Sequence, residues 1–194
     1  MKALRIVLWL LVAAAAIGFA ALYWRQAGPP EPQQQQVSFG GPFTLVDGND
    51  QPFASNRLAG RPYTMFFGFT HCPDVCPTTL ARLVKLRRQM GDDEAFRILF
   101  VTVDPERDGP AEVGKYTDLF GAPIVGLTGS PAQIAKVKKD FGIFSEKVGE
   151  GEAYTVDHTA TVLLFDRNGK FQSTISPEEG DQAALAKLRR LTSG

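Results

Sequence analysis

The chain has 194 residues, and its 21 lysines and arginines balance 21 aspartates and glutamates, so its formal net charge is zero. This balance leaves no basic footprint of the kind that nucleic-acid-binding proteins carry. The two cysteines allow a single bridge, and a chain of this length does not need such a staple to fold, which argues against a disulfide scaffold.

The first 25 residues predict a membrane anchor. Ile6–Trp24 is an uncharged apolar run, close to the ~20 residues that a helix needs to cross the hydrocarbon core. Lys2 and Arg5 precede this run, so the positive-inside rule puts the amino terminus in the cytoplasm and the rest of the chain after Arg25 on the far side. A cleaved signal peptide is the alternative, but cleavage after the small residues 14–16 would fall inside the run.

A flexible linker is predicted for residues 26–41. The segment Gly28-Pro29-Pro30-Glu31-Pro32 is followed by four glutamines, so it offers no apolar surface to bury. Residues 42–194 are long enough to form one domain with its own core. The sequence therefore divides into an anchor at 1–25, a linker at 26–41 and a folded domain at 42–194.

The domain alternates predicted strands and helices. An Asp-Gly turn favours a hairpin over residues 43–53, and an apolar run predicts a buried central strand at 63–67. A helix capped by Thr78 or Thr79 follows the cysteines. The other predicted elements are a strand at 96–103, a helix opened by Asp108-Gly109-Pro110, a strand at 124–127, a helix opened by Ser130-Pro131, an Asn-Gly hairpin over 160–175 and a final helix with Ala184, Leu185, Leu188 and Leu191 on one side.

This order of elements predicts a thioredoxin-like α/β fold with the cysteine pair at the start of a helix. Backbone N–H groups and the helix dipole favour an anion at such a place, so we expect the pKa of Cys76 to be lowered. The acidic loop at 104–108 leaves the carboxyl end of a strand, where open α/β sheets place their sites, but we expect Asp108 to serve mainly as a helix cap.

Both cysteines and both histidines lie in or beside two short segments, 70–77 and 156–159. Thiolates prefer soft metal ions and imidazole suits copper and zinc, so Cys72, Cys76 and one distant imidazole match a three-ligand site for either metal. The same dithiol could instead cycle to a disulfide. Side chains that are adjacent in sequence rarely point at one centre, so we expect His71 to tune the thiols and Asp157 either to orient His158 or to stay in solvent.

Three motifs resemble those of the Sco/SenC family of copper-binding assembly proteins: Gly68–Leu80 with both cysteines, Val103–Asp108, and Tyr154–Thr159 with the distant histidine. The resemblance covers most of the chain. It implies a membrane-tethered, thioredoxin-like domain that binds copper, as Cu(I), Cu(II) or both, through Cys72, Cys76 and His158. It also implies a role in assembling the binuclear copper centre of cytochrome c oxidase subunit II.

The resemblance further implies a bacterial inner-membrane protein with its domain in the periplasm. The implied partners are cytochrome c oxidase subunit II, a copper donor chaperone and a thiol reductant. The alternative function is a membrane-tethered thiol-disulfide oxidoreductase that reduces the copper-ligand cysteines of the same client. Three residues rather than two separate Cys72 from Cys76, which argues against a general thioredoxin. Pro73 stands where peroxiredoxins carry a threonine, which argues against a peroxidase.

Overall fold

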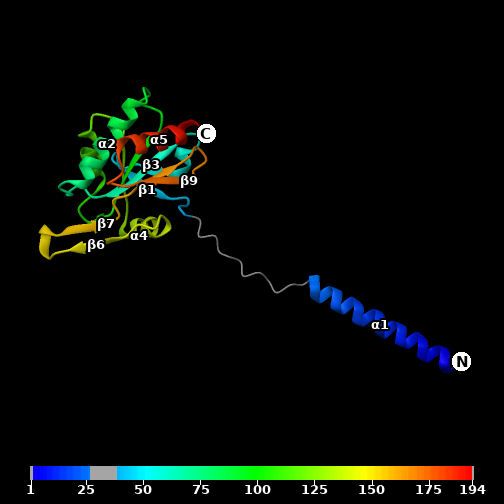
Figure 1. The fold of residues 1–194 in the computed structure, drawn as a ribbon. Coiled ribbons are helices and arrows are strands. Elements are labelled where there is room, and N and C mark those ends of the chain that lie inside the picture. The colour runs from blue at the N-terminus through cyan, green and yellow to red at the C-terminus, as the bar shows by residue number, and fades with distance from the viewer. Residues whose placement is uncertain (1, 27–38, 194) are drawn as a thin grey trace. The chain divides into compact units, whose positions relative to one another are not determined.

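The structure, a computed structural model, describes residues 2–26 and 39–193, which form two separate units (Figure 1). The first unit is a single helix, α1 (Lys2–Gln26). Its segment Arg5–Tyr23 has a mean hydropathy of 2.4, and the helix is long and apolar enough to cross a membrane, as the sequence predicts. Most of the predicted linker, residues 27–38, lies outside the described residues.

The second unit is built on a seven-stranded mixed sheet with the strand order β2-β1-β5-β4-β3-β8-β9. Strands β3, β4 and β5 run parallel, whereas β1 pairs antiparallel with β5 and β8 pairs antiparallel with β3. The elements are β1 (Thr44–Asp47), β2 (Pro52–Ala54), a 3-10 turn (Ser55–Leu58), β3 (Tyr63–Gly68), α2 (Val75–Gln89), β4 (Arg97–Thr102), α3 (Pro110–Asp118), β5 (Val125–Thr128), α4 (Pro131–Asp140), β6 (Ser145–Val148), a 3-10 turn (Gly151–Ala153), β7 (Thr155–His158), β8 (Val162–Phe165), β9 (Phe171–Ile175) and α5 (Asp181–Ser193).

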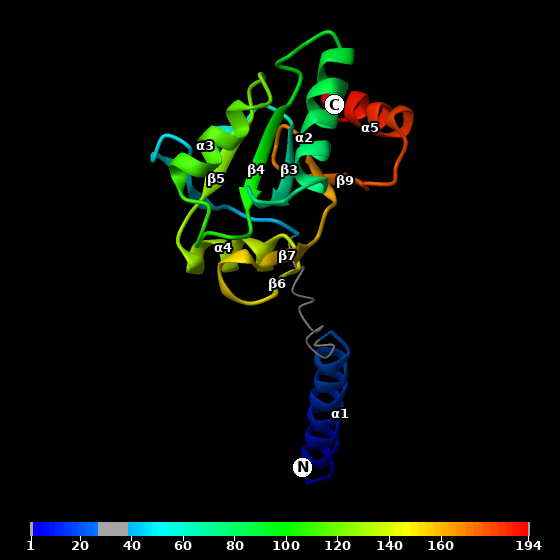
Figure 2. The same cartoon turned by 90° about the vertical axis from the view of Figure 1, so that its left-hand side faces the viewer.

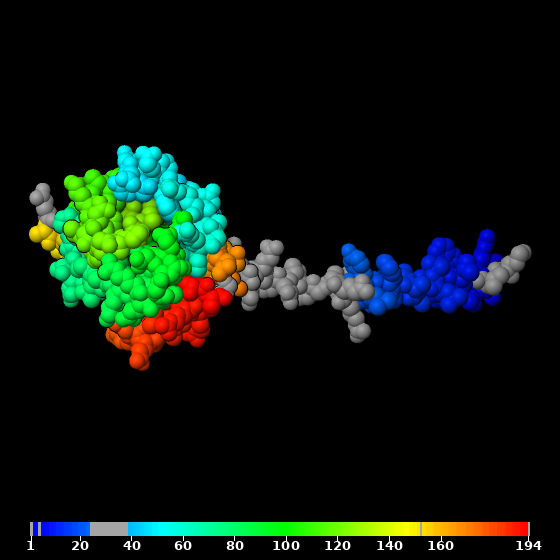
Figure 3. Space-filling view, turned by 90° about the horizontal axis from the view of Figure 1, so that it is seen from above, coloured from blue at the N-terminus to red at the C-terminus, as the bar shows by residue number. Residues whose placement is uncertain are grey.

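Helices cover both faces of this sheet (Figure 2). The connections β3-α2-β4 and β4-α3-β5 step across the sheet in one direction, so right-handed crossovers put α2 and α3 on the same face. Helix α5 lies beside α2, where Arg82 donates to Asp181 over 2.8 Å, and it forms part of the outer surface of the domain (red in Figure 3). Helix α4 covers the opposite face, because Phe141 at its end packs against Phe67 of β3.

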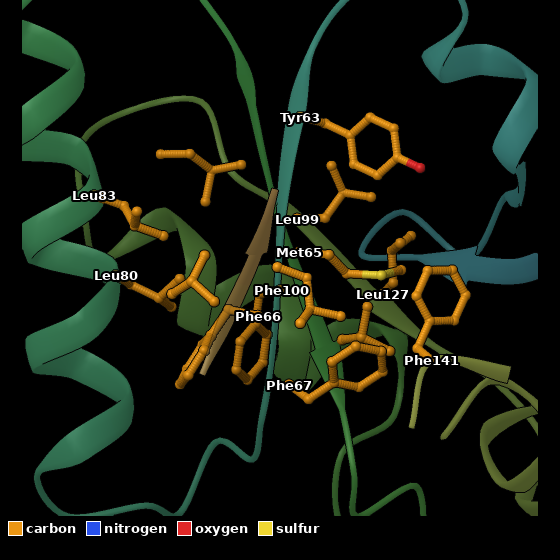
Figure 4. Close-up of a cluster of buried hydrophobic side chains, with 14 of the residues drawn as sticks. Tyr63, Met65, Phe66, Phe67, Leu80, Leu83, Leu99, Phe100, Leu127 and Phe141 are labelled. Atoms are coloured by element: carbon orange, nitrogen blue, oxygen red, sulfur yellow. The ribbon is translucent and has the colours of Figure 1, made fainter. Parts of the chain in front are cut away.

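The core is centred on β3, whose six residues are all buried. Side chains alternate between the two faces of a strand. Figure 4 shows the result: Phe66 lies with Phe100 on the side of α2, whereas Phe67 points toward Phe141. The near-continuous apolar run at 63–67 is therefore the central strand that the sequence predicts, paired to β4 on one side and to β8 on the other.

Helix α2 begins earlier than the sequence predicts. It starts at Val75, with Asp74 in the cap position, so neither Thr78 nor Thr79 is the cap. Thr78 instead donates a side-chain hydrogen bond of 3.2 Å to the Asp74 carboxylate. Pro77 is tolerated at the third helical position because the first N–H groups of a helix have no intrahelical partner. The two cysteines consequently lie just before the helix and inside its first turn.

One pair of strands was not predicted from the sequence. β6 and β7 form a separate two-stranded antiparallel sheet that pairs Ser145 with His158 (Figure 1). The predicted hairpins β1-β2 and β8-β9 are confirmed, and so is α5 with its buried Ala184, Leu188 and Leu191.

Phe39 and Gly40 already contact the domain, since the Gly40 N–H donates to the Asp140 carbonyl over 2.9 Å.

We predict that two leucine-to-alanine changes separate the core from the surface. Leu99 of β4 is wholly buried, so Leu99→Ala should lower the free energy of unfolding by about 2–5 kcal/mol through lost burial and a cavity. Leu119 follows α3 and is 79% exposed, so Leu119→Ala should change the free energy of unfolding by less than about 0.5 kcal/mol. Urea unfolding of both variants measures this difference, and equal losses would contradict the core described above.

Candidate metal centre

The candidate site lies at the carboxyl edge of the parallel strands. β3 ends at Gly68, and the chain then runs through Cys72 into the first turn of α2, which holds Cys76. The third residue comes from a segment distant in sequence. His158 is the last residue of β7 and lies shortly before β8, the antiparallel neighbour of β3. The two segments that the sequence singles out for chemistry therefore meet at one edge.

The donor atoms of Cys72, Cys76 and His158 all lie within 4.8 Å of one another. The Cys76 sulfur is 3.6 Å from Nε2 of His158, and the Cys76 backbone N–H donates to the Cys72 sulfur over 3.4 Å. Thiolate sulfurs and imidazole nitrogens bind zinc at about 2.3 and 2.0 Å, so two ligands of one ion are at most roughly 4.5 Å apart. The three donors thus stand nearly at ligand spacing.

The sulfur of Cys76 is enclosed by the sheet. A side chain at Gly68 would place its Cβ 2.7 Å from this sulfur and 2.9 Å from the Phe100 ring, so only glycine fits beneath the thiol. Cys76 has no exposed surface and Cys72 is 8% exposed. Both cysteines are free thiols. Access to the donors is consequently from the side of Cys72 and the half-buried His158.

The expected lowering of the Cys76 pKa is wrong for the metal-free protein. Burial raises the pKa of this thiol strongly, and the neighbouring Cys72 raises it further. The start of α2 does favour an anion, but removal of the sulfur from water outweighs that effect. Cys76 is therefore a protonated thiol at neutral pH, and a soft metal ion that binds it must displace the proton.

His158 is oriented by the backbone carbonyl of the next residue, Thr159, rather than by Asp157. Its Nδ1 lies 3.1 Å from the carbonyl oxygen of Thr159, which makes Nδ1 the protonated nitrogen and leaves Nε2 free toward Cys76. Asp157 is exposed and only adds a favourable charge nearby. Burial lowers the pKa of His158, so the imidazole is neutral at pH 7. The rings of Phe66 and Phe69 pack edge-on against it.

His71 does not share this centre. Its side chain is 57% exposed, and its Nδ1 faces the hydroxyl of Thr70 at 3.1 Å and the carboxylate of Asp108 at 3.7 Å. Asp74, between the cysteines, is also exposed. The described residues thus place His71 outside the group of Cys72, Cys76 and His158, and its expected effect on the thiols stays a prediction.

Asp108 is not the helix cap that the sequence predicts. Gly109 occupies the cap position of α3, and Asp108 is wholly buried. Its carboxylate accepts hydrogen bonds from the Thr70 N–H at 2.9 Å, the Thr70 hydroxyl at 2.6 Å and the Thr102 hydroxyl at 2.6 Å. Asp108 therefore holds the loop that leads into Cys72, a role that its neighbours in sequence do not reveal.

The donor set can be tested against the metals that it suits. Two thiolates and one neutral imidazole, buried or half-buried and with Nε2 facing the Cys76 sulfur, match a soft ion such as Cu(I), and Zn(II) shares this preference. No carboxylate joins the group among the described residues, so the site has no ligand that favours a hard cation. The residues present therefore fit a soft transition-metal ion.

We predict that the metal-free protein is most stable between about pH 6.5 and pH 8.5, the usual pKa values of free His and Cys. The folded protein binds fewer protons at His158 than the unfolded chain, so its free energy of unfolding falls as the pH drops through about 6.5. The raised pKa of Cys76 has the opposite effect. The folded protein keeps the proton of this thiol when the unfolded chain loses it, so the free energy of unfolding also falls as the pH rises above about 8.5.

Urea unfolding of the parent, His158→Gln and Cys76→Ser proteins across this pH range measures both effects. His158→Gln should flatten the acid side only, and Cys76→Ser the alkaline side only. Unchanged slopes in the two variants would contradict the burial of these groups.

Comparison with known proteins supports the resemblance. The SCO1/SenC family model matches residues 31–193. The mitochondrial protein SCO2 of Saccharomyces cerevisiae is 35% identical over 158 residues, which cover 79% of this chain and 52% of that protein, so the chain spans about half the length of this relative. A SCO2-like protein of Rickettsia prowazekii is 32% identical over 175 residues, covering 84% of this chain and 85% of that protein.

A solved structure agrees with the fold. Bradyrhizobium japonicum ScoI with copper bound superposes with a TM-score of 0.72 at 42% identity, covering 79% of this chain and 99% of that one. The predicted thioredoxin-like α/β fold is thereby confirmed. A family match over this length, on a domain that shares its fold with a solved member, establishes that the chain belongs to the SCO1/SenC family.

Proposed function

We propose that this protein is a membrane-anchored copper chaperone that binds copper through Cys72, Cys76 and His158. The observation that carries the proposal is the convergence of these three donors, within 4.8 Å of one another, with both cysteines buried and the histidine half-buried. Copper is the cargo rather than a resident cofactor. The copper-bound structure of the Bradyrhizobium relative supports copper over zinc, which ligand chemistry alone does not distinguish.

The geometry suits a metal that must be taken up and released. Two thiolates and one imidazole satisfy Cu(I) at low coordination number, and an added water would extend the same set to Cu(II). Cys72 and His158 keep some exposed surface, so a client ligand can approach the ion from their side while Cys76 remains buried. Transfer then proceeds by exchange of ligands rather than by opening of the core.

The client that we propose is the binuclear copper site of cytochrome c oxidase subunit II, as the family resemblance implies. Helix α1 would hold the domain at the bacterial inner membrane with the domain in the periplasm, supported by the apolar span and by Lys2 and Arg5 before it. A copper donor chaperone and a thiol reductant complete the proposed set of partners.

A second candidate function is reduction of the client's copper-ligand cysteines. The observation that favours it is the pair of free, adjacent thiols, with the Cys76 N–H directed at the Cys72 sulfur. In this reaction two electrons and two protons pass from Cys72 and Cys76 to the client disulfide, and the two sulfurs end as one disulfide. A thiol reductant must then restore the pair.

We predict that Cys72→Ala, Cys76→Ala and His158→Ala each weaken Cu(I) binding by more than the roughly 10–100-fold typical of losses outside the ligand set. Each change removes one of three donors. The measurement is an anaerobic competition titration of the full-length protein in detergent micelles. His71→Ala is the matched histidine control and should change the affinity by less than about threefold, below that range for outer-shell losses.

The same titration includes the parent protein with Cys72 and Cys76 oxidised to a disulfide, which has no thiolate to offer and should not bind Cu(I) tightly. Copper affinity in His158→Ala equal to that of the parent would overturn the ligand set. Equal affinity in the oxidised and reduced proteins would overturn the requirement for thiolates.

A further prediction separates the two functions, because His158→Ala removes a copper ligand but keeps the dithiol. Copper-loaded parent protein is mixed with the reduced, metal-free copper domain of subunit II, and metal-free parent protein is mixed with the same domain in its disulfide form. A chaperone transfers copper in the first mixture, and His158→Ala fails to do so. A reductase produces client thiols in the second mixture, to the same extent with the parent and with His158→Ala. Production of client thiols with no copper transfer in the first mixture would overturn the chaperone function.

A further inference from the structure

The hairpin formed by β6 and β7 carries a metal donor but is not part of the main sheet. His158 is its last residue and pairs with Ser145 across the hairpin. Within the described residues, the backbone ladder of β7 runs only to β6, and the main sheet meets His158 through a side chain, the ring of Phe66 on β3. The position of the imidazole therefore depends in part on what anchors the hairpin to the rest of the domain.

Arg107 contacts the turn end of the hairpin, where the chain passes from β6 into β7. Its guanidinium lies 3.6 Å from the ring centroid of Tyr154, the residue before β7, and donates to the Tyr154 carbonyl over 3.0 Å. It also donates to the carboxylate of Asp104 over 2.5 Å. Tyr154 closes the cluster, because its hydroxyl donates to Asp104 over 2.7 Å. Side chain and backbone at the start of β7 are thus held by one residue.

Arg107 also contacts the cysteine-bearing side of the site. Its guanidinium is 5.8 Å from the ring of Phe69, which lies between β3 and Cys72. The Phe69 ring also meets the His158 ring, with the two centroids 5.9 Å apart and the ring planes at 90°. Arg107, Phe69 and His158 therefore form a continuous packed row that joins the loop of the cysteines to the hairpin of the histidine.

The chemistry of this cluster favours arginine. A planar guanidinium can stack on Tyr154 while its N–H groups bind a carboxylate and a carbonyl, which the compact ammonium of lysine cannot do. The Asp104 side chain is wholly buried and that of Arg107 is 19% exposed, so this pair is largely shielded from solvent. The neighbouring pair Lys147–Glu106 is exposed and holds the hairpin only weakly.

We propose that Arg107 is a positioning residue that holds His158 at ligand distance from the two cysteines, an inference that rests on the proposed copper site. It does not touch the metal. By fixing Tyr154 and packing on Phe69, it restricts the hairpin and reduces the ordering that metal binding has to impose on His158.

The test is a double-mutant cycle on Cu(I) affinity with full-length protein in detergent micelles. Arg107→Gln should weaken Cu(I) binding about 10-fold, within the range for residues that orient metal ligands. In the His158→Ala background the same change should have less than about a twofold effect, because the residue that it positions is gone. Tyr154→Leu, which keeps the Arg107–Asp104 pair, should weaken binding in the same direction.

Arg57 provides the matched control. Its guanidinium lies 4.9 Å from the Phe53 ring, 3.9 Å from the Asp47 carboxylate and 3.5 Å from the Pro52 carbonyl, so it has the same three kinds of partner away from the metal site. Arg57→Gln should leave Cu(I) affinity unchanged. Hydrogen exchange of the metal-free proteins gives a second measure: Arg107→Gln should speed exchange in β6 and β7 but not in β3 or β4.

Each outcome decides the matter. Parent-like affinity and exchange in Arg107→Gln and Tyr154→Leu would overturn the positioning role, and so would an equal loss of affinity with and without His158, which would indicate a general effect of charge or folding. If Arg107→Gln does not fold, Tyr154→Leu carries the cycle. Failure of the parent itself to bind Cu(I) would overturn the proposed function instead, while the exchange measurement would still test the hold on the hairpin.

Discussion

The close approach of the Cys76 sulfur to the end of β3 is the contact on which the site depends. Gly68 has no side chain, so the first turn of α2 can place the thiol against the backbone of the central strand and the ring of Phe100. This contact fixes one donor within the rigid core, since β3 is hydrogen-bonded on both sides and wholly buried. The other two donors are arranged around that fixed point.

Burial then decides the chemistry of the thiol. A sulfur removed from water resists ionisation, so Cys76 keeps its proton in the metal-free protein. A soft metal ion that binds there compensates for the burial by supplying positive charge beside the sulfur. The neutral state of His158 also suits metal binding, because Nε2 offers its lone pair without prior loss of a proton.

Much of the fold is visible in the sequence because it depends on local patterns. The apolar run at 63–67 and the Asn-Gly turn between β8 and β9 each specify their element without reference to the rest of the chain. The candidate ligands could also be proposed, since the motifs around Cys72, Cys76 and His158 carry the family resemblance. The start of α2 was less predictable, because both Asp74 and the two threonines can cap a helix.

What the sequence could not provide depends on contacts between distant segments. Asp108 precedes Gly-Pro, a typical helix start, yet its carboxylate binds Thr70 and Thr102. The segment 145–148 has three exposed residues and no apolar alternation, so β6 exists only because β7 pairs with it. The raised pKa of Cys76 was also not predictable. A helix dipole is a local feature that the sequence indicates, whereas the burial of the sulfur depends on contacts with distant residues.

The site therefore combines two supports of different stiffness. Cys76 belongs to the core, whereas His158 belongs to a separate hairpin whose turn end is held by the side chain of Arg107. Regions with few ladder hydrogen bonds to the core open at lower free energy than central strands. In the proposed function this asymmetry has a direct consequence: the imidazole is the ligand that can leave first, and a client donor can then occupy its place while both sulfurs still hold the ion. A site built from three core residues would bind the metal as well but would release it only by disturbing the sheet.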